Sequence, residues 1–115
     1  MRDFTHDIRE VQRRLAEAAV YLSVIENRER FAVLEHEVAE PGLWDDQDRA
    51  KKLNAEYANI KDDLEAFDTL TEEIENVEVL HELARDEDDA SLEPEIETAI
   101  GMVAATFDQL ELRSM

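Results

Sequence analysis

The chain of 115 residues contains no cysteine, so neither a disulfide nor a thiolate metal site can form. Glycine and proline occur twice each, which leaves few breaks in regular structure and rules out a glycine-rich phosphate loop. Aromatic residues make up only 6% of the chain, whereas charged residues make up 37%. This composition is typical of long helices or coiled coils. The absence of cysteine also fits a cytoplasmic protein.

Long apolar runs and basic residues are scarce as well. No run of about 18 apolar residues occurs and no signal-peptide core is visible, so we expect no membrane association. Acidic residues number 31 against 12 basic ones, which gives a formal net charge of −19. A chain with this charge is repelled by phosphate backbones, so we expect no direct binding to DNA. Its charge favours a basic protein surface as partner.

Apolar residues recur at alternating spacings of three and four, the heptad pattern of packed helices. The pattern predicts four helices, at about 3–22, 24–40, 46–85 and 91–113. The expected apolar stripes are Phe4, Ile8, Val11, Leu15, Ala18, Leu22 and Ile25; Val24, Phe31, Leu34 and Val38; Ala50, Leu53, Tyr57, Ile60, Leu64, Phe67, Thr71 and Ile74, then Val77, Leu80 and Ala84 after a three-residue slip; and Ile96, Ile100, Val103, Phe107 and Leu110.

Capping signals suggest where these helices begin. Ser23, with a glutamate three residues later, forms a capping-box pattern, and the apolar stripe changes phase there. We therefore place a break near Ser23, and one continuous helix from Asp3 to Glu40 is the alternative. Asp3 and Ser91 are expected as N-caps, and Pro94 falls in the first turn of the last helix, where its missing N–H costs little.

The third predicted helix determines the expected shape. At about 1.5 Å per residue it would be roughly 60 Å long, twice the diameter of a compact domain of this size. Short turns make neighbouring helices antiparallel. We therefore predict an all-α fold, an elongated antiparallel helical bundle or coiled-coil hairpin of about four helices, in one domain over residues 1–115. The second and fourth helices would pack along the third, and the first would cover an end or side.

The turn after the second helix is the candidate structural site. Pro41 and Gly42 stop that helix, and Asp46 or its neighbour starts the next one, with Arg49 in its first turn. We expect Trp44, the only tryptophan, to pack this turn onto the bundle. An exposed tryptophan that recognises a partner is the alternative.

Candidate chemical motifs are incomplete. The segment His36-Glu37-Val38-Ala39-Glu40 lacks the second histidine of a zinc-protease helix. Glu78-Val79-Leu80-His81 is a single Glu-x-x-His, whereas di-iron bundles need two, so we expect His81 simply to border the apolar stripe. Three scattered serines on a rod offer no concave pocket. We therefore expect no enzyme activity, no cofactor and no metal.

Charge is unevenly distributed along the chain. Residues 62–89 hold 13 carboxylates and a single basic residue, Arg85. This segment is either a solvated helix face or an electrostatic dock for a basic protein. Two small basic clusters, at 9–14 and 49–52, are interpreted as ion pairs along a helix in preference to RNA contacts.

Three segments carry a resemblance to a known family. They are the tryptophan turn Glu40–Ala50, the segment Leu80-His81-Glu82-Leu83-Ala84 with the acidic loop that follows it, and Leu110-Glu111-Leu112-Arg113-Ser114-Met115. Through them, the stretch from Tyr21 to Met115 resembles the N-terminal domain of the bacterial peptide chain release factor 2 family. The resemblance implies a helical bundle with a long coiled-coil hairpin, in agreement with the heptad pattern.

The resemblance also implies a function. Members of that family read UGA and UAA stop codons and trigger peptidyl-tRNA hydrolysis, using a Ser-Pro-Phe tripeptide and a Gly-Gly-Gln loop, neither of which occurs in this chain. We therefore expect a first domain of a larger factor, with the remainder C-terminal to Met115. The implied partner is the ribosome, at the large subunit near the stalk base, where the acidity suits a basic ribosomal protein. The domain would orient the factor there.

Two other functions remain open. A generic acidic coiled-coil adaptor for protein–protein contacts would share the heptads, and exposed heptads would also allow dimerisation. A tRNA-binding helical arm, as in seryl-tRNA synthetase, should be basic, which the net charge of −19 argues against.

Overall fold

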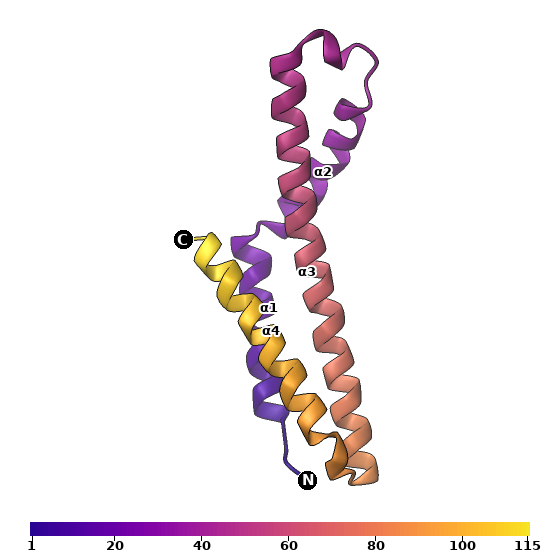
Figure 1. Cartoon of the computed structure of the whole chain (residues 1–115), viewed down its shortest axis with the longest axis vertical. Helices are drawn as coiled ribbons and strands as arrows, with labels where there is room; N and C mark the ends of the chain where they lie inside the picture. The colour runs from indigo at the N-terminus through magenta and orange to yellow at the C-terminus, as the bar shows by residue number, and fades with distance from the viewer.

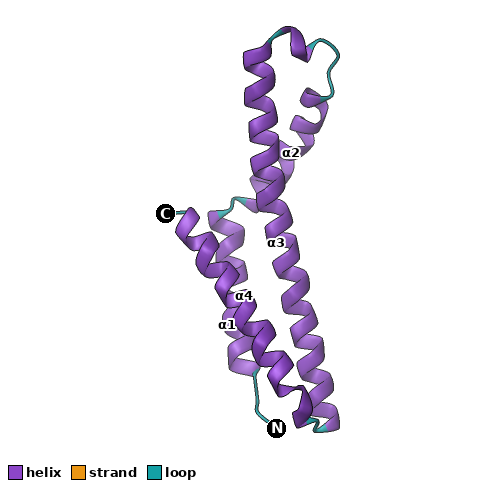
Figure 2. Ribbon diagram, viewed as in Figure 1, coloured by secondary structure: helices purple, strands orange, loops and turns teal.

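A computed structural model describes all residues from 1 to 115 and contains helices and loops but no strand (Figures 1 and 2). Four α-helices and two short 3-10 turns follow one another in the order α1 (Thr5–Tyr21), α2 (Val24–Val38), η1 (Leu43–Asp45), α3 (Gln47–Glu87), η2 (Ala90–Leu92) and α4 (Glu93–Arg113). The all-α class and the four helices are therefore confirmed. Each observed helix boundary lies within two residues of the predicted range.

The molecule is a rod of 63 × 27 × 20 Å, and α3 runs along its whole length (Figure 1). The 41 residues of α3 span about 62 Å at 1.5 Å per residue, so this one helix sets the length of the molecule. One half of α3 pairs with α2 in a hairpin, and the other half packs with α1 and α4 in a three-helix bundle. The predicted rod and the packing of α2 and α4 along the third helix are confirmed.

The interior consists of two apolar clusters. The larger one follows α3 from the hairpin into the bundle, and the smaller one closes the end of the rod near the N-terminus. Of the 21 buried residues, 20 are apolar and the other is His81. The larger cluster contains Val11, Ala18, Leu22, Val24, Leu34, Leu43, Ala50, Leu53, Ile60, Leu64, Leu70, Ile74, Val103, Phe107 and Leu110. The smaller one contains Phe4, Ile8, Val77, Ala84 and Ile96.

The predicted break between the first two helices exists, but its mechanism differs from the prediction. Ser23 has a left-handed backbone (φ 51°, ψ 48°), and its side chain makes no capping hydrogen bond. The capping-box interpretation is therefore wrong. The side-chain amide of Asn27 instead donates to the carbonyl of Leu22 at 2.8 Å. The left-handed residue also rotates the chain, so Ile25 leaves the predicted stripe and is 74% exposed.

The turn between α3 and α4 is held by a different residue from the one predicted. The carboxylate of Asp89 accepts hydrogen bonds from the N–H of Ser91 at 3.0 Å and from its hydroxyl at 2.5 Å. Ser91 thus lies in the 3-10 turn as a donor and does not cap α4, whose N-cap position is Leu92. The prediction for Ser91 is therefore wrong: its hydroxyl donates to Asp89 and is not placed to accept from an N–H of α4. Pro94 lies in the first turn of α4, as predicted.

Candidate functional site

The turn at the tip of the α2–α3 hairpin is built from the residues that the sequence singled out. Gly42 has φ +90°, a left-handed conformation that favours glycine, and it reverses the chain after Pro41. The N–H of Leu43 donates to the carbonyl of Glu40 at 3.2 Å, which closes the turn. The carboxylate of Asp46 then accepts from the N–H of Arg49 at 3.1 Å and caps α3.

The structure corrects the expected role of Trp44. Leu43 is 2% exposed and belongs to the larger apolar cluster, whereas Trp44 is 67% exposed. The 3-10 turn that follows Gly42 points these neighbouring side chains in different directions, and only Leu43 reaches the hairpin interior. Leu43, not Trp44, packs the turn onto α3. Trp44 is thus a largely exposed aromatic side chain in η1, and this turn lies at one extremity of the rod (Figure 1).

A spacing in the sequence could have identified Leu43. It lies seven residues before Ala50, so the apolar stripe of the third helix extends back across the turn by one heptad. The conspicuous tryptophan next to it obscured this register.

Three basic residues follow the exposed tryptophan in the first turns of α3: Arg49, Lys51 and Lys52. The guanidinium of Arg49 lies 3.7 Å from the carboxylate of Glu40, so one cation of the cluster pairs within the tip. Lys51 and Lys52 are exposed and take part in no ion pair. The tip therefore combines an aromatic surface with two free ammonium groups, on a molecule that is otherwise strongly acidic.

The other predicted basic cluster is engaged in ion pairs. Arg13 pairs with Glu10 and Glu17 on its own helix, as the sequence suggested. Arg14 instead reaches across to α4, where its guanidinium lies 2.7 Å from the carboxylates of both Asp108 and Glu111. These hydrogen bonds raise the pKa of Arg14 against the opposing effect of burial. Arg14 therefore joins α1 to α4, and neither Arg13 nor Arg14 is a free cation.

Two side chains clamp the α2–α3 hairpin. The guanidinium of Arg30 donates two hydrogen bonds to the carboxylate of Glu56, at 2.8 and 2.7 Å. This fork geometry is the strong bidentate form of a charge-assisted hydrogen bond. The hydrogen bond from Arg30 lowers the pKa of Glu56 below its usual value.

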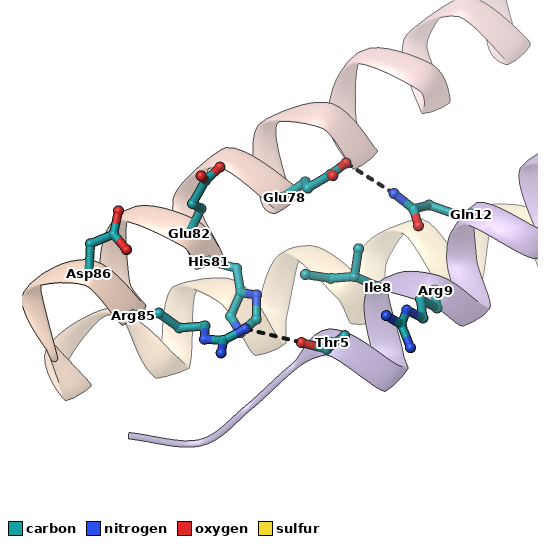
Figure 3. A pocket seen from close by; sticks show the side chains of 9 residues that line it. All are labelled: Thr5, Ile8, Arg9, Gln12, Glu78, His81, Glu82, Arg85 and Asp86. Carbon is teal, nitrogen blue, oxygen red and sulfur yellow. Dashed lines mark hydrogen bonds between the residues drawn. The ribbon is translucent and has the colours of Figure 1, made fainter.

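A polar groove of about 520 Å³ separates α1 from the end of α3 (Figure 3). It is bridged by a hydrogen bond of 3.0 Å from the amide of Gln12 to Glu78 and by one of 3.4 Å from Arg85 to the hydroxyl of Thr5. Glu78, Glu82 and Asp86 line the groove from α3, and Arg9 lines it from α1 (Figure 3). Eight of the nine residues that line the groove are polar or charged, so it is a polar seam between helices.

His81 lies at the base of this groove and is buried, with 5% of its surface exposed. Its Nε2 accepts a hydrogen bond from the N–H of Phe4 at 3.0 Å, and its ring meets the Phe4 ring edge-on at 5.8 Å. Nε2 must therefore be unprotonated, because a protonated nitrogen cannot accept. His81 is a core residue that holds the N-terminal segment and does not merely border the stripe. Its spacing of seven from Ile74 was the signal that could have placed it there.

The same segment differs from the prediction at Asp3. The N-cap position of α1 is Phe4, and the carboxylate of Asp3 accepts from the N–H and the hydroxyl of Thr5 at 2.9 and 2.6 Å. The hydrogen bonds to Thr5 lower the pKa of Asp3. Asp3 thus satisfies a free N–H at the start of α1. It does so from the residue before the N-cap position, whereas the sequence predicted Asp3 as the N-cap itself.

The acidic segment 62–89 faces solvent at nearly every carboxylate. Asp63 pairs with Arg113 at 3.0 Å and Asp68 with Arg28 at 2.6 Å, and most of the others have no cation beside them. No group of three or more histidine and acidic side chains converges in a way that could hold a metal ion. None of the helices has the length and apolarity needed to cross a bilayer. A role of the acidic face in docking stays a prediction.

Comparison with known proteins identifies relatives of this chain. The PCRF domain family matches residues 27–115. Peptide chain release factor 2 of Arthrobacter sp. is 32% identical over 96% of the chain, and that of Nocardia farcinica is 31% identical over 95%. Peptide chain release factor 2 of Streptomyces avermitilis is 26% identical over 98% of the chain. The chain covers 30%, 29% and 31% of the lengths of these three relatives, respectively.

These matches confirm the resemblance that the tryptophan turn and the other two segments indicated. The family match extends from α2 through the hairpin and α4, and thus includes both turns. The chain therefore belongs to the PCRF domain family.

Proposed function

We propose that this chain is the N-terminal helical domain of a cytoplasmic peptide chain release factor that reads UGA and UAA stop codons. The names of its relatives and the family match support a role in translation termination. The remainder of the factor, C-terminal to Met115, would read the codon and promote hydrolysis. Neither a Ser-Pro-Phe nor a Gly-Gly-Gln sequence occurs in the 115 residues, so the contribution of this chain is binding and orientation.

The elongated shape of the chain supports a role as a rigid spacer between a contact at one end and the rest of the factor at the other. One uninterrupted helix runs the length of a rod of 63 Å, with helices packed against both of its halves. A continuous helix stiffened in this way transmits position from one end to the other. The rod would hold the rest of the factor in a fixed orientation relative to a contact made at its far end.

Charge supports a protein as the contacted part of the ribosome. With a net charge of −19, the chain is repelled by bare rRNA and attracted to a basic ribosomal protein, which we place on the large subunit near the stalk base. Attraction of this kind chiefly speeds association and fixes orientation. The exposed carboxylates of α3 between residues 62 and 89 would supply the attractive field.

The single observation that carries the contact proposal is the exposure of Trp44 at the extremity of the rod. Tryptophan is enriched among the residues that dominate binding energy at interfaces, and Trp44 is not part of the buried core. The tip would serve as the anchor, and the acidic flank would guide approach.

Release kinetics of the complete factor test this proposal. Removing residues 1–115 should lower kcat/KM for peptide release, because ribosome association weakens, and should leave kcat at saturation nearly unchanged. Trp44→Ala in the complete factor should lower kcat/KM in the same direction without affecting the fold. Ile25→Ala, which removes another exposed apolar side chain away from the tip, is the matched control. A deletion that changes neither parameter would refute the proposal.

A further inference from the structure

The bundle of α1, α3 and α4 has three grooves between its helices, and one of them differs in character. The α1/α3 groove is bridged by polar side chains, and the α1/α4 groove is crossed by Arg14. The α3/α4 groove, of about 300 Å³, is lined mainly by apolar side chains. These are Val77, Leu80, Ala99, Met102 and Val103.

The floor and the rim of this groove have different exposure. Val77 and Val103 form a buried floor, and Leu80 is half-buried. Met102 stands at the rim and is 67% exposed. Methionine is flexible and polarizable, so a side chain in this position adapts readily to an apolar partner. The α3/α4 groove thus offers an apolar surface with an adjustable edge.

The walls of the α3/α4 groove are acidic. Its polar lining consists of Glu73, Glu95 and an asparagine. Along α3 the groove continues into a second hollow of about 330 Å³, which shares Glu73 and adds Asp62 and Glu65. No lysine or arginine lines either hollow, whereas arginines line both other grooves. An apolar floor between negative walls is complementary to an amphipathic segment with basic flanks.

We propose that the α3/α4 groove binds an amphipathic helix of a partner protein. The apolar face of that helix would lie on Leu80 and Met102, and lysine or arginine side chains flanking the face would meet Glu73 and Glu95. A helix laid in such a groove would complete a four-helix bundle around α3. A second copy of this chain does not fit, because its own net charge of −19 would bring carboxylates against carboxylates.

This binding surface is distinct from the hairpin tip. The groove lies between α3 and α4 on the three-helix half of the rod, whereas Trp44 belongs to η1, the turn that joins α2 to α3 at the other end (Figure 1). Binding of a basic helix in the groove therefore does not depend on whether the tip contacts the ribosome.

A fluorescein-labelled synthetic peptide tests the proposal with no ribosome present. The probe is a helical peptide of leucine and lysine in a heptad pattern, titrated with the chain and followed by fluorescence anisotropy. A peptide of the same composition, scrambled so that its helix has no apolar face, should bind at least about tenfold more weakly, a difference of 1.4 kcal/mol. Binding should also weaken as NaCl is raised. Equal binding of the two peptides would overturn the proposal, since attraction would then be purely by net charge.

Two lysine substitutions locate the binding surface. Met102→Lys removes the rim side chain and repels the probe, and we expect a loss of about tenfold in affinity, typical of a central interface residue. Val79→Lys makes the same change in net charge at a similarly exposed position on α3 outside the groove, and should change affinity less than about twofold. Circular dichroism of both variants checks that they fold. Equal losses from the two would contradict the proposed location.

Other occupants of the groove would give distinct results. If the complete factor fails to bind the peptide that this chain binds, the remainder of the factor covers the groove and a separate partner is ruled out. If sedimentation shows a dimer of the chain that Met102→Lys dissociates, the occupant is a second copy. Either result would overturn the proposal, and a peptide-binding complete factor with a monomeric chain would support it.

Discussion

At the hairpin tip, two adjacent apolar residues have different roles: Leu43 packs inside the hairpin, and Trp44 lies on the surface. The sequence predicts the place of this turn, because proline and glycine stop the helix and Asp46 can cap the next. It does not predict which of the two side chains faces inward, because the direction of a side chain in a one-turn 3-10 segment depends on the neighbouring helix.

Truncating these two residues should have opposite consequences for stability. Leu43→Ala removes a buried side chain and leaves a cavity, so the free energy of unfolding should fall by about 2–5 kcal/mol. Trp44→Ala should change it by less than about 0.5 kcal/mol, since little of the indole is packed. Urea unfolding followed by far-ultraviolet circular dichroism measures both values. A larger loss from Trp44→Ala than from Leu43→Ala would show that the tryptophan packs the turn.

His81 should be required for docking of the N-terminal segment. His81→Leu leaves the N–H of Phe4 buried without an acceptor, which should lower the free energy of unfolding by about 1–3 kcal/mol. His36→Leu, at an exposed position of α2, is the control and should have little effect. Hydrogen exchange provides a local readout, because the amide of Phe4 should lose protection in His81→Leu only. Unchanged protection of that amide would contradict the assigned hydrogen bond.

At the scale of elements, heptad spacing predicted all four helices because burial of an apolar stripe dominates helix formation in a protein of this kind. Helix ends were less predictable. Ser23 and Ser91 resemble N-caps in the sequence, yet the first adopts a left-handed backbone and the second donates to Asp89. Ile25 fits its stripe by spacing, but the left-handed Ser23 turns it toward solvent. Thr71 fits its stripe as well, but α3 buries the neighbouring Leu70 more fully. These outcomes depend on tertiary packing that spacing does not encode.

The two glycines should respond oppositely to the same substitution. Gly42→Ala places a side chain at φ +90° and brings its Cβ within 3.3 Å of the Asp45 carboxylate, so we expect a loss of about 1–2 kcal/mol. Gly101→Ala lies within α4, and the new Cβ would meet no atom within 4 Å beyond its chain neighbours and the helix's own backbone, so it should stabilise the protein by about 0.5–1 kcal/mol. Thermal and urea unfolding measure both changes. A gain from Gly42→Ala would be inconsistent with the left-handed turn.

The clamp between α2 and α3 should make part of the stability depend on pH. The pKa of Glu56 is lowered in the folded protein by the hydrogen bond from Arg30, relative to its usual value of 4.5. A lowered pKa means that the contribution of this carboxylate is fully present above pH 4.5 and is lost as pH falls through the folded pKa. Glu56→Gln removes that contribution. The stability gap between the protein and this variant should therefore narrow below pH 4.5, and a gap constant from pH 7 to pH 3 would contradict the clamp.

At the scale of the whole molecule, the rod and its acidity were both readable in the sequence. The length follows from the uninterrupted heptads of α3, and the charge follows from composition. The candidate binding surfaces could not be predicted from the sequence, because the exposure of Trp44 and the apolar α3/α4 groove arise from how the helices pack. The central proposal is that this acidic rod has no chemistry of its own and places a release factor on the large ribosomal subunit.

The most direct test of that proposal is the affinity of this chain for isolated ribosomal subunits, measured with a fluorescent label on the chain. We predict saturable binding to the large subunit that weakens as NaCl is raised and with Trp44→Ala, and no saturable binding to the small subunit. Equal affinity for the two subunits, or no saturable binding to the large one, would contradict the account.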